Sequence, residues 1–304
     1  MGWRQVQYTS KDETINSLSD LVTVVSRTKS GEAQILGTAF PICSSPENTL
    51  MLSASHVIEE AFKNSSYHSE RRNARNLNHI PEPDNKQYEL IGKWVKETED
   101  LWCLLTVGQK LVQCFVTGVC LRPPLDMAFL VLDTSHLKEV TMVFAINSNI
   151  LNAGEEIIIT SLITKGNTRD LIARHGVVTK VKSTGNLINA PVYETNIPIE
   201  AGASGGPVFR YTGDFKSPKE VIGVISSDFS CSDSFDNPNI DGNSYVSIMC
   251  SATPLNVENT DGTVLTFQDM CANGLVKDFG SYIKKVKLTS YPDGNWSQSF
   301  PKII

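Results

Sequence analysis

The chain has 304 residues, enough to bury a large core, and a formal net charge of −6. This charge offers no basic surface for nucleic acid, and the sequence has no 18-residue apolar run that could span a membrane. The first residues lack an apolar signal core, so we expect a cytoplasmic protein with no nucleic-acid and no membrane partner.

Short runs rich in Val, Ile, Leu and Thr recur between turn residues over most of the chain, and they predict an all-β fold. The expected strands are Leu21–Arg27, Ile35–Ile42, Leu50–Ser53, Leu101–Thr106, Gln113–Cys120, Met127–Leu132, Glu156–Ser161, Val177–Val181, Tyr193–Asn196, Val208–Tyr211, Val221–Ser226 and Ser244–Ser251.

His56 follows an apolar run and three small residues. This context is expected where a buried strand delivers a catalytic base to a cleft. The other histidines lie in polar stretches or near expected turns and are interpreted as surface or hydrogen-bonded imidazoles: His68, His79, His136 and His175.

The stretch Lys63–Lys93 is polar and irregular, with three arginines and two prolines in its central part. A solvated loop is the simplest interpretation. Because insertions of this length are often functional, a regulatory or substrate-gating loop is the alternative.

Asp126 stands just before the apolar run Met127–Leu132, where a carboxylate would be largely buried and would need compensation for its charge. Such an acid could fix the tautomer of a catalytic histidine. Asp133, at the far end of the same run, is the alternative, although its place before Thr134 and Ser135 favours a turn or cap role.

Residues Gly202–Pro207 place the Ser204 hydroxyl between glycines on a sharp turn. Small neighbours let a carbonyl group approach, and glycine backbones can direct N–H groups at a developing oxyanion. The pattern also satisfies the G-x-S-x-G elbow of α/β-hydrolases. In that fold the histidine follows the serine, and no histidine follows Ser204, so only triads in which histidine precedes serine remain.

Near the C-terminus, apolar residues three or four apart predict a helix, and Thr266 with Asp269 resembles a capping box. The stripe consists of Phe267, Met270, Cys271, Leu275, Phe279, Tyr282 and Ile283. We expect this helix to pack on the domain that carries the serine motif. Lys284, Lys285 and Lys287 would complement its C-terminal dipole.

The chain has seven cysteines, an odd number, and they show no C-x-x-C spacing. They are interpreted as mostly buried, reduced thiols, so neither disulfides nor a zinc site is expected. None lies in a glycine-flanked turn, which disfavours a cysteine nucleophile.

The order His56, Asp126, Ser204 resembles that of the chymotrypsin-like (trypsin-fold) serine peptidases. Ser53–Val57 is similar to the histidine motif of this family, Asp126–Leu130 to its aspartate motif and Gly202–Pro207 to its serine motif. Weaker matches extend the likeness to most of residues 18–255; they are Gly37–Phe40, Gly176–Val178 and Val221–Ser226. The HtrA-like, bacterial-type branch is the most similar.

The resemblance implies an all-β fold of two six-stranded antiparallel barrels, with the active site in the cleft between them and a C-terminal helix. Residues 18–145 would form the barrel that carries His56 and Asp126, and residues 146–255 the barrel that carries Ser204. Residues 256–304 would be a C-terminal extension.

The resemblance also implies a serine endopeptidase that acts on protein or peptide substrates and needs no metal or cofactor. Ser204 would be the nucleophile, His56 the general base and Asp126 the group that orients it. The N–H groups of Gly202 and Ser204 would form the oxyanion hole.

The same likeness assigns Ser226, Ser227 and Asp228 to substrate binding, because this strand would pair with an extended substrate. Asp228 would lie near the mouth of the specificity pocket and could favour a basic side chain at the cleavage site. A loop aspartate that faces solvent is the alternative.

Two departures from the family matter for regulation. Ala203 stands where secreted zymogens have an aspartate that receives a newly cut N-terminus, so we expect control by loop ordering or by an activating protein partner. The residues after the barrels do not fit the PDZ domain that HtrA-like enzymes usually carry. Two alternatives therefore remain open: a peptide-binding module with little catalysis, and a competent site that stays inactive until a partner orders the oxyanion loop.

Overall fold

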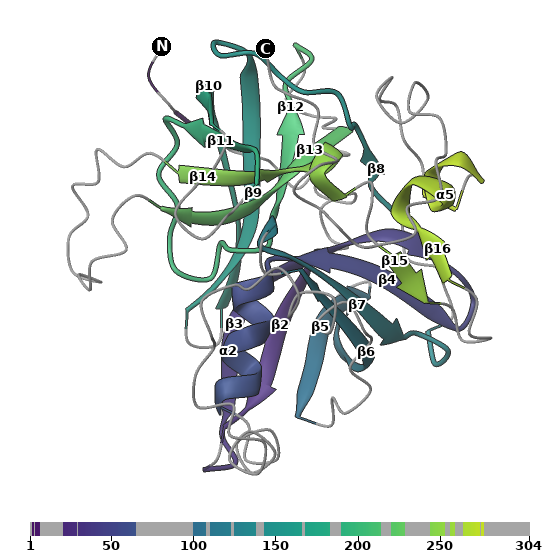
Figure 1. The fold of residues 1–304 in the computed structure, drawn as a ribbon. Coiled ribbons are helices and arrows are strands. Elements are labelled where there is room, and N and C mark those ends of the chain that lie inside the picture. The colour runs from purple at the N-terminus through teal and green to yellow at the C-terminus, as the bar shows by residue number, and fades with distance from the viewer. Residues whose placement is uncertain are drawn as a thin grey trace.

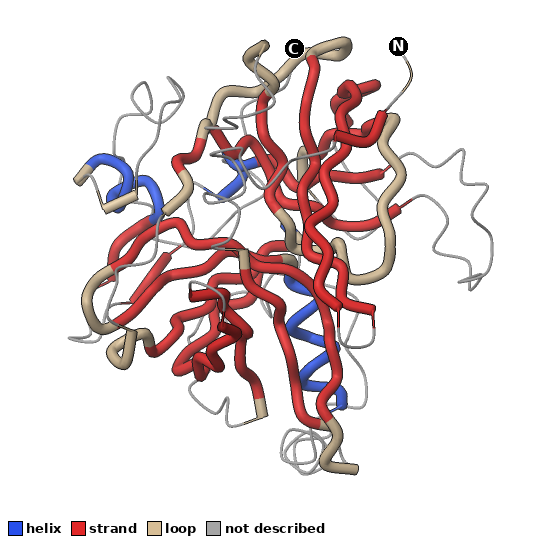
Figure 2. The backbone as a smooth tube through the Cα atoms, turned by 180° about the vertical axis from the view of Figure 1, so that it is seen from behind, coloured by secondary structure: helices blue, strands red, loops and turns tan. Residues whose placement is uncertain are grey.

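The computed structural model describes residues 2, 4–6, 21–28, 30–64, 100–107, 110–122, 125–137, 143–165, 168–182, 190–213, 220–228, 244–252, 256–258, 264–273 and 275–276. Strands make up most of this part of the chain, and its helices are short, as the view from behind shows (Figure 2).

Six antiparallel strands in the N-terminal half close into a barrel (Figure 1). Their order around the barrel is β2, β3, β4, β7, β6, β5, and β5 pairs back to β2. They are β2 (Val22–Arg27), β3 (Ala33–Ser44), β4 (Asn48–Ser53), β5 (Leu101–Val107), β6 (Lys110–Arg122) and β7 (Met127–Asp133). Along β6, Cys114 and Val116 are buried whereas Phe115 and Thr117 are exposed, the two-residue period of a strand with one face toward a core.

A second ring of six antiparallel strands follows, in the order β9, β10, β11, β14, β13, β12, and β12 pairs back to β9. Its strands are β9 (Glu156–Lys165), β10 (Thr168–Lys182), β11 (Val192–Thr195), β12 (Pro207–Arg210), β13 (Glu220–Asp228) and β14 (Ser244–Ile248). Two short strands extend this sheet: β1 (Arg4–Val6) pairs with β10, and β8 (Ala145–Ile146) pairs in parallel with β13. The predicted fold of two six-stranded antiparallel barrels is confirmed.

All twelve expected strands are present, but some of their ends differ. Strand β10 begins at Thr168 rather than Val177, and it forms a long hairpin with β9. The last expected strand stops at Ile248, because Met249–Ala252 form a 3-10 helix, η2. The strands that were not predicted have only two or three residues, too few for a visible alternation: β1, β8, β15 (Asn256–Glu258) and β16 (Val264–Thr266).

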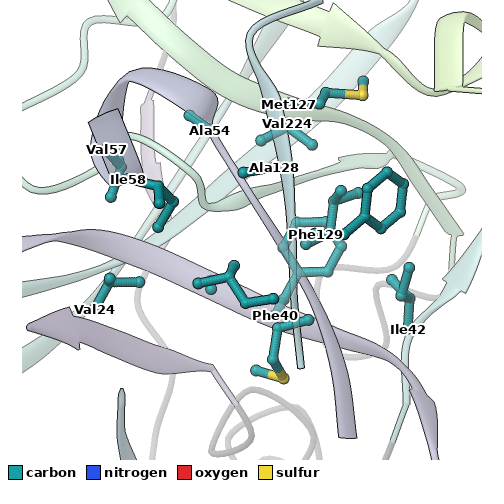
Figure 3. Packing of buried hydrophobic residues seen from close by; sticks show 14 of the residues in the cluster. Val24, Phe40, Ile42, Ala54, Val57, Ile58, Met127, Ala128, Phe129 and Val224 are labelled. Carbon is teal, nitrogen blue, oxygen red and sulfur yellow. The ribbon is translucent and has the colours of Figure 1, made fainter. Parts of the chain in front are cut away.

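Helix α2 (Ser55–Asn64) was also not predicted. It begins directly after β4, so His56 lies in the first turn of a helix and not at the end of a strand, as we had expected. The apolar residues Val57, Ile58 and Ala61 stand at helical spacing and are buried. They belong to the same core cluster as Phe40 and Phe129 of the first barrel (Figure 3), which ties the position of His56 to the packing of this barrel.

The C-terminal helix α5 (Phe267–Ala272) begins as predicted, with the side chain of Thr266 accepting from the backbone of Asp269 and a complete capping box. It ends earlier than predicted, at Ala272, and residues 277–304 lie outside the described part of the chain. The Phe267 ring packs 5.5 Å from that of Phe129 in β7, and it belongs to a core cluster that also includes Phe209 of β12, so residues of both barrels surround it.

Candidate active site

His56 and Asp126 face each other although they stand 70 residues apart in the chain. The imidazole Nδ1 lies 2.9 Å from Oδ2 of Asp126 and 3.0 Å from Oδ1, and the backbone N–H of His56 donates to Oδ1 at 3.0 Å. A carboxylate at Nδ1 favours the tautomer that carries its proton there. The other ring nitrogen, Nε2, is then a proton acceptor.

Asp126 is almost completely buried, with 2% of its surface exposed, and a buried carboxylate is costly unless it is hydrogen-bonded. Besides the two groups of His56, the hydroxyl of Ser226 donates to its Oδ2. Its backbone is unusual as well. With φ at +48°, Asp126 is the one non-glycine residue with a positive φ in the described part of the chain. Aspartate and asparagine tolerate this left-handed region better than most residues, so this position restricts which residue can stand there.

Ser204 lies on a compact turn between β11 and β12. The Ala203 N–H donates to the Glu200 carbonyl, and the Gly206 N–H donates to the Ala203 carbonyl, both at 3.0 Å. Gly205, with φ at +84°, passes so close to the first barrel that a Cβ there would lie 2.1 Å from the carbonyl oxygen of Thr38. Only glycine fits this approach.

Thr38 on β3 connects the two barrels at this point. Its N–H donates to the carbonyl of Ser204 at 2.9 Å, and its hydroxyl donates to the carbonyl of Gly202 at 3.0 Å. The same hydroxyl accepts from the N–H of Leu162 on β9 at 3.2 Å. Sequence reasoning noted Thr38 only as part of a family motif. Nothing in the sequence shows that this side chain bonds to residues 124 and 164 positions further along the chain.

Ser226 joins Asp126 to Ser204. Its hydroxyl donates to Asp126, and its carbonyl oxygen accepts from the hydroxyl of Ser204 at 2.9 Å. Ser226 was predicted only as part of the substrate-binding strand, so its side-chain contact with Asp126 was missed. Ser227 and Asp228 complete β13, and the backbone of Asp228 pairs with Ser244 of β14.

The remaining candidate residues lie away from this site. Asp133 accepts from the backbone N–H and the hydroxyl of Ser135, so it has the turn role that was predicted for it. His136 also lies in a turn. His175 does not, since it is buried in the middle of β10. His68 and His79 fall outside the described residues.

The six cysteines in the described part of the chain form no disulfide there, and Cys231 falls outside it. Burial raises the pKa of the Cys114 thiol to about 11 and that of Cys250 to about 12, so both are thiols rather than thiolates at neutral pH. Among the described residues, no group of histidine, cysteine or acidic side chains could hold a metal ion. No helix in that part of the structure is both long and apolar enough to cross a membrane.

Two six-stranded barrels, with histidine and aspartate on the first and a serine between glycines on the second, define the trypsin-type class of fold. The family model of the trypsin-like peptidase domain matches residues 37–223, more than half of the chain. The chain therefore belongs to this family, as predicted, and it has the fold of a serine protease. A search of curated proteins found no match.

Similar solved structures include HtrA-type proteases. The HtrA-type protease AlgW with tripeptide is 14% identical with a TM-score of 0.46, and the match covers 78% of this chain and 60% of that one. AlgW with decapeptide is 14% identical with a TM-score of 0.45, covering 78% and 64%. Deg5 is 16% identical with a TM-score of 0.43, covering 72% and 87%. The chain thus matches about three fifths of the AlgW chains, and at these identities the likeness concerns the fold alone.

Proposed function

We propose that this chain is a serine endopeptidase that hydrolyses peptide bonds of protein or peptide substrates through Ser204, His56 and Asp126. The contact between Nδ1 of His56 and the buried Asp126 is the observation that carries the proposal. With the imidazole proton on Nδ1, Nε2 can accept a proton from the serine. The imidazole is partly exposed and belongs to the barrel that faces the serine turn.

The reaction follows from these groups. The Ser204 oxygen attacks the carbonyl carbon of the scissile bond while Nε2 of His56 takes the hydroxyl proton. Asp126 stabilises the imidazolium that forms. When the tetrahedral intermediate collapses, the imidazolium gives its proton to the leaving amine, and an acyl-enzyme remains on Ser204. A water molecule, activated by His56 in the same way, then releases the second product and restores the serine.

The oxyanion that forms in both steps is assigned to the N–H groups of Gly202 and Ser204. In the turn around them, the N–H groups of Ala203, Gly205 and Gly206 donate to protein carbonyls. Gly202 has φ at +88°, and Thr38 holds its carbonyl oxygen. Fixed donors of this kind stabilise developing charge without reorganising during the reaction.

Strand β13 is proposed to bind the substrate backbone next to the nucleophile. The carbonyl of Ser226 lies 2.9 Å from the Ser204 hydroxyl, which puts the start of the segment Ser226–Asp228 beside the reacting group. An extended peptide can add to such an edge through main-chain hydrogen bonds. Asp228 is proposed to favour a basic side chain at the cleavage site of the substrate.

Regulation is proposed to act on the conformation of Ser204 rather than by zymogen cleavage. The hydroxyl has one proton, and here it is donated to the Ser226 carbonyl and not to His56. A rotation about the Cα–Cβ bond of Ser204 is needed before His56 can accept this proton, and catalytic hydrogen bonds often form only in the substrate complex. Binding of substrate, or of an activating partner, would favour the productive rotamer.

Labelling with a fluorophosphonate probe, which reacts with activated serines, tests the proposal. We expect the wild-type protein to incorporate the probe and to cleave peptides from a mixed library. Ser204→Ala should lose labelling and reduce turnover on the order of 10⁶-fold. Ser135→Ala, which changes an exposed turn serine, is the matched control and should behave like the wild type.

The Ser204–Ser226 hydrogen bond also favours one alternative, a module that captures peptides and turns them over little or not at all. Fluorescence anisotropy with the same library would detect such binding. Peptide binding without any probe incorporation, with and without cell lysate, would establish this alternative and overturn the peptidase proposal.

A further inference from the structure

We propose that Arg174 is a positioning residue for the oxyanion turn, a role that rests on the proposed peptidase function. Arg174 lies on β10, and its guanidinium reaches the chain segment that leads into Gly202. One nitrogen, Nη1, donates to the carbonyl oxygen of Pro198 at 2.6 Å. The other, Nη2, forms an ion pair with the carboxylate of Glu200.

Two kinds of contact hold the segment Ile197–Glu200. Ile197 and Ile199 point into the core of the second barrel and are buried there. The carbonyl oxygen of Pro198 and the carboxylate of Glu200 contact the guanidinium of Arg174. The two isoleucines therefore anchor the segment to the core, and Arg174 anchors it through a backbone carbonyl and a carboxylate.

Arg174 is the middle of three attachments along this stretch. Before it, the side chain of Asn196 accepts from the Val177 N–H at 2.8 Å. After it, the hydroxyl of Thr38 donates to the Gly202 carbonyl. The Glu200 carbonyl accepts from the Ala203 N–H, so a residue held by Arg174 also forms the turn that contains Gly202.

Arg174 is well suited to hold this turn. It lies within β10, with Ile159 of β9 opposite it on one edge and Gln5 of β1 on the other, so its backbone is fixed on both sides. Its side chain is only 12% exposed, which limits competition from water. A guanidinium is planar and holds its N–H donors in a fixed fork, whereas an ammonium group is a compact charge whose donors rotate with its flexible stem.

The Arg174–Glu200 contact gives the turn an ion pair, which the residue before the nucleophile, Ala203, cannot form. Alanine has no charge that could fix the turn, whereas Glu200, three residues earlier, is fixed by Arg174. The stabilisation of an oxyanion is sensitive to small displacements of its N–H donors. Loss of Arg174 should therefore reduce the stabilisation of the transition state more than it reduces the affinity for substrate.

Steady-state kinetics of Arg174→Gln test this role. We expect kcat to fall about tenfold or more, KM to change less than about twofold, and the Ki of a peptide aldehyde, which mimics the tetrahedral intermediate, to rise in parallel with the loss in kcat. Arg174→Lys should fall between the two proteins. Arg210→Gln is the control, because Arg210 also forms an ion pair on this barrel, with Glu155 at 2.8 Å, but its side chain is 40% exposed and its hydrogen bond is not to the turn.

Hydrogen exchange of the Ala203 amide provides a readout that does not depend on activity. It is measured in Ser204→Ala with and without Arg174→Gln, and we expect exchange to accelerate when Arg174 is replaced, but not when Arg210 is. Unchanged exchange at Ala203, or a kcat loss no larger than that of Arg210→Gln, would overturn the positioning role. If the wild-type protein neither cleaves peptides nor reacts with the fluorophosphonate, the peptidase proposal fails, and the exchange experiment still decides whether Arg174 holds the turn.

Discussion

The hydroxyl of Ser204 donates to the backbone carbonyl of Ser226, while the hydroxyl of Ser226 donates to Asp126. Ser226 of β13 thus contacts both Asp126 from the first barrel and Ser204 from the second. Strand β13 therefore links the turn that carries Ser204 to the acid. This arrangement makes the distance between Ser204 and Asp126 a property of barrel packing, so changes at the barrel interface should reach the proposed chemistry.

Substitutions of Asp126 separate charge from backbone conformation. Asp126→Asn keeps a residue that tolerates φ of +48° but removes the charge and favours the wrong histidine tautomer, so kcat should fall about 10⁴-fold. Asp126→Ala should lose activity to a similar extent and, in addition, about 1 kcal/mol of stability from the left-handed backbone. Urea unfolding and peptide turnover of both variants check this. Equal stability of the two variants would contradict the conformational part.

Gly205 and Gly154 offer a comparison between steric clash and backbone strain. Both have positive φ, +84° and +91°, but a Cβ at Gly205 would lie within 2.3 Å of Thr38 and Ser53, whereas a Cβ at Gly154 has nothing within 4 Å. Gly154→Ala should cost about 1–2 kcal/mol, the price of the left-handed conformation alone. Gly205→Ala should lower the unfolding midpoint in urea much further and abolish probe labelling.

Similar effects of the two alanine variants on the urea midpoint would mean that the barrels can separate slightly at Gly205. In that case the close approach of the serine turn to β3 would not be a constraint on the fold.

The sequence predicts the barrel strands well because each has a clear alternation or apolar run, as Met127–Leu132 does in β7. It also predicts His56, Asp126 and Ser204, since each stands in a local motif. Other features depend on distant partners. The hydroxyl of Thr38 and the side chain of Ser226 have no local signature. The partner of Thr38 lies 164 residues further along the chain, and that of Ser226 lies 100 residues before it.

Helix α2 was missed for another reason. Its apolar residues Val57, Ile58 and Ala61 follow an apolar strand without a break, so the change from a strand period to a helical period is hard to see in ten residues. Strand β1 has three residues and forms because β10 offers a free edge, a condition that only the folded barrel creates.

Removal of the Thr38 hydroxyl should affect both stability and activity. Thr38→Val leaves the Leu162 N–H and the Gly202 carbonyl without this partner, which should lower the free energy of unfolding by about 1–3 kcal/mol. It should also lower kcat, because Gly202 is a proposed oxyanion donor. Thr49→Val is the matched control: Thr49 is equally buried and bonds to the hydroxyls of Ser44 and Thr134, away from the site.

Thr49→Val should therefore reduce stability to a similar extent and leave kcat per folded molecule unchanged. Chemical denaturation and active-site-titrated kinetics separate the two effects. If both variants lost kcat equally, the link from Thr38 to the oxyanion turn would have no functional weight.

His175 should make stability depend on pH. Burial lowers the pKa of His175 from its ordinary value of 6.5, and Arg4 on the neighbouring strand lowers it further, while Glu156, 3.7 Å from Nε2, acts in the opposite direction. The folded protein therefore binds this proton less readily than the unfolded chain does. As the pH falls below about 6.5, the unfolded state gains the proton first, so the free energy of unfolding should decrease. Above that pH His175 is neutral in both states and should not make stability depend on pH.

The comparison that isolates this effect is the pH dependence of unfolding for the wild type, His175→Gln and His136→Gln. The wild type and the His136 variant, which changes an exposed turn residue, should lose stability along parallel curves as the pH falls below about 6.5. His175→Gln should give a flatter curve in this range, although it is less stable at neutral pH because a buried ring that packs on Tyr211 is lost. Parallel curves for all three proteins would mean that His175 is protonated as easily in the folded barrel as in the unfolded chain.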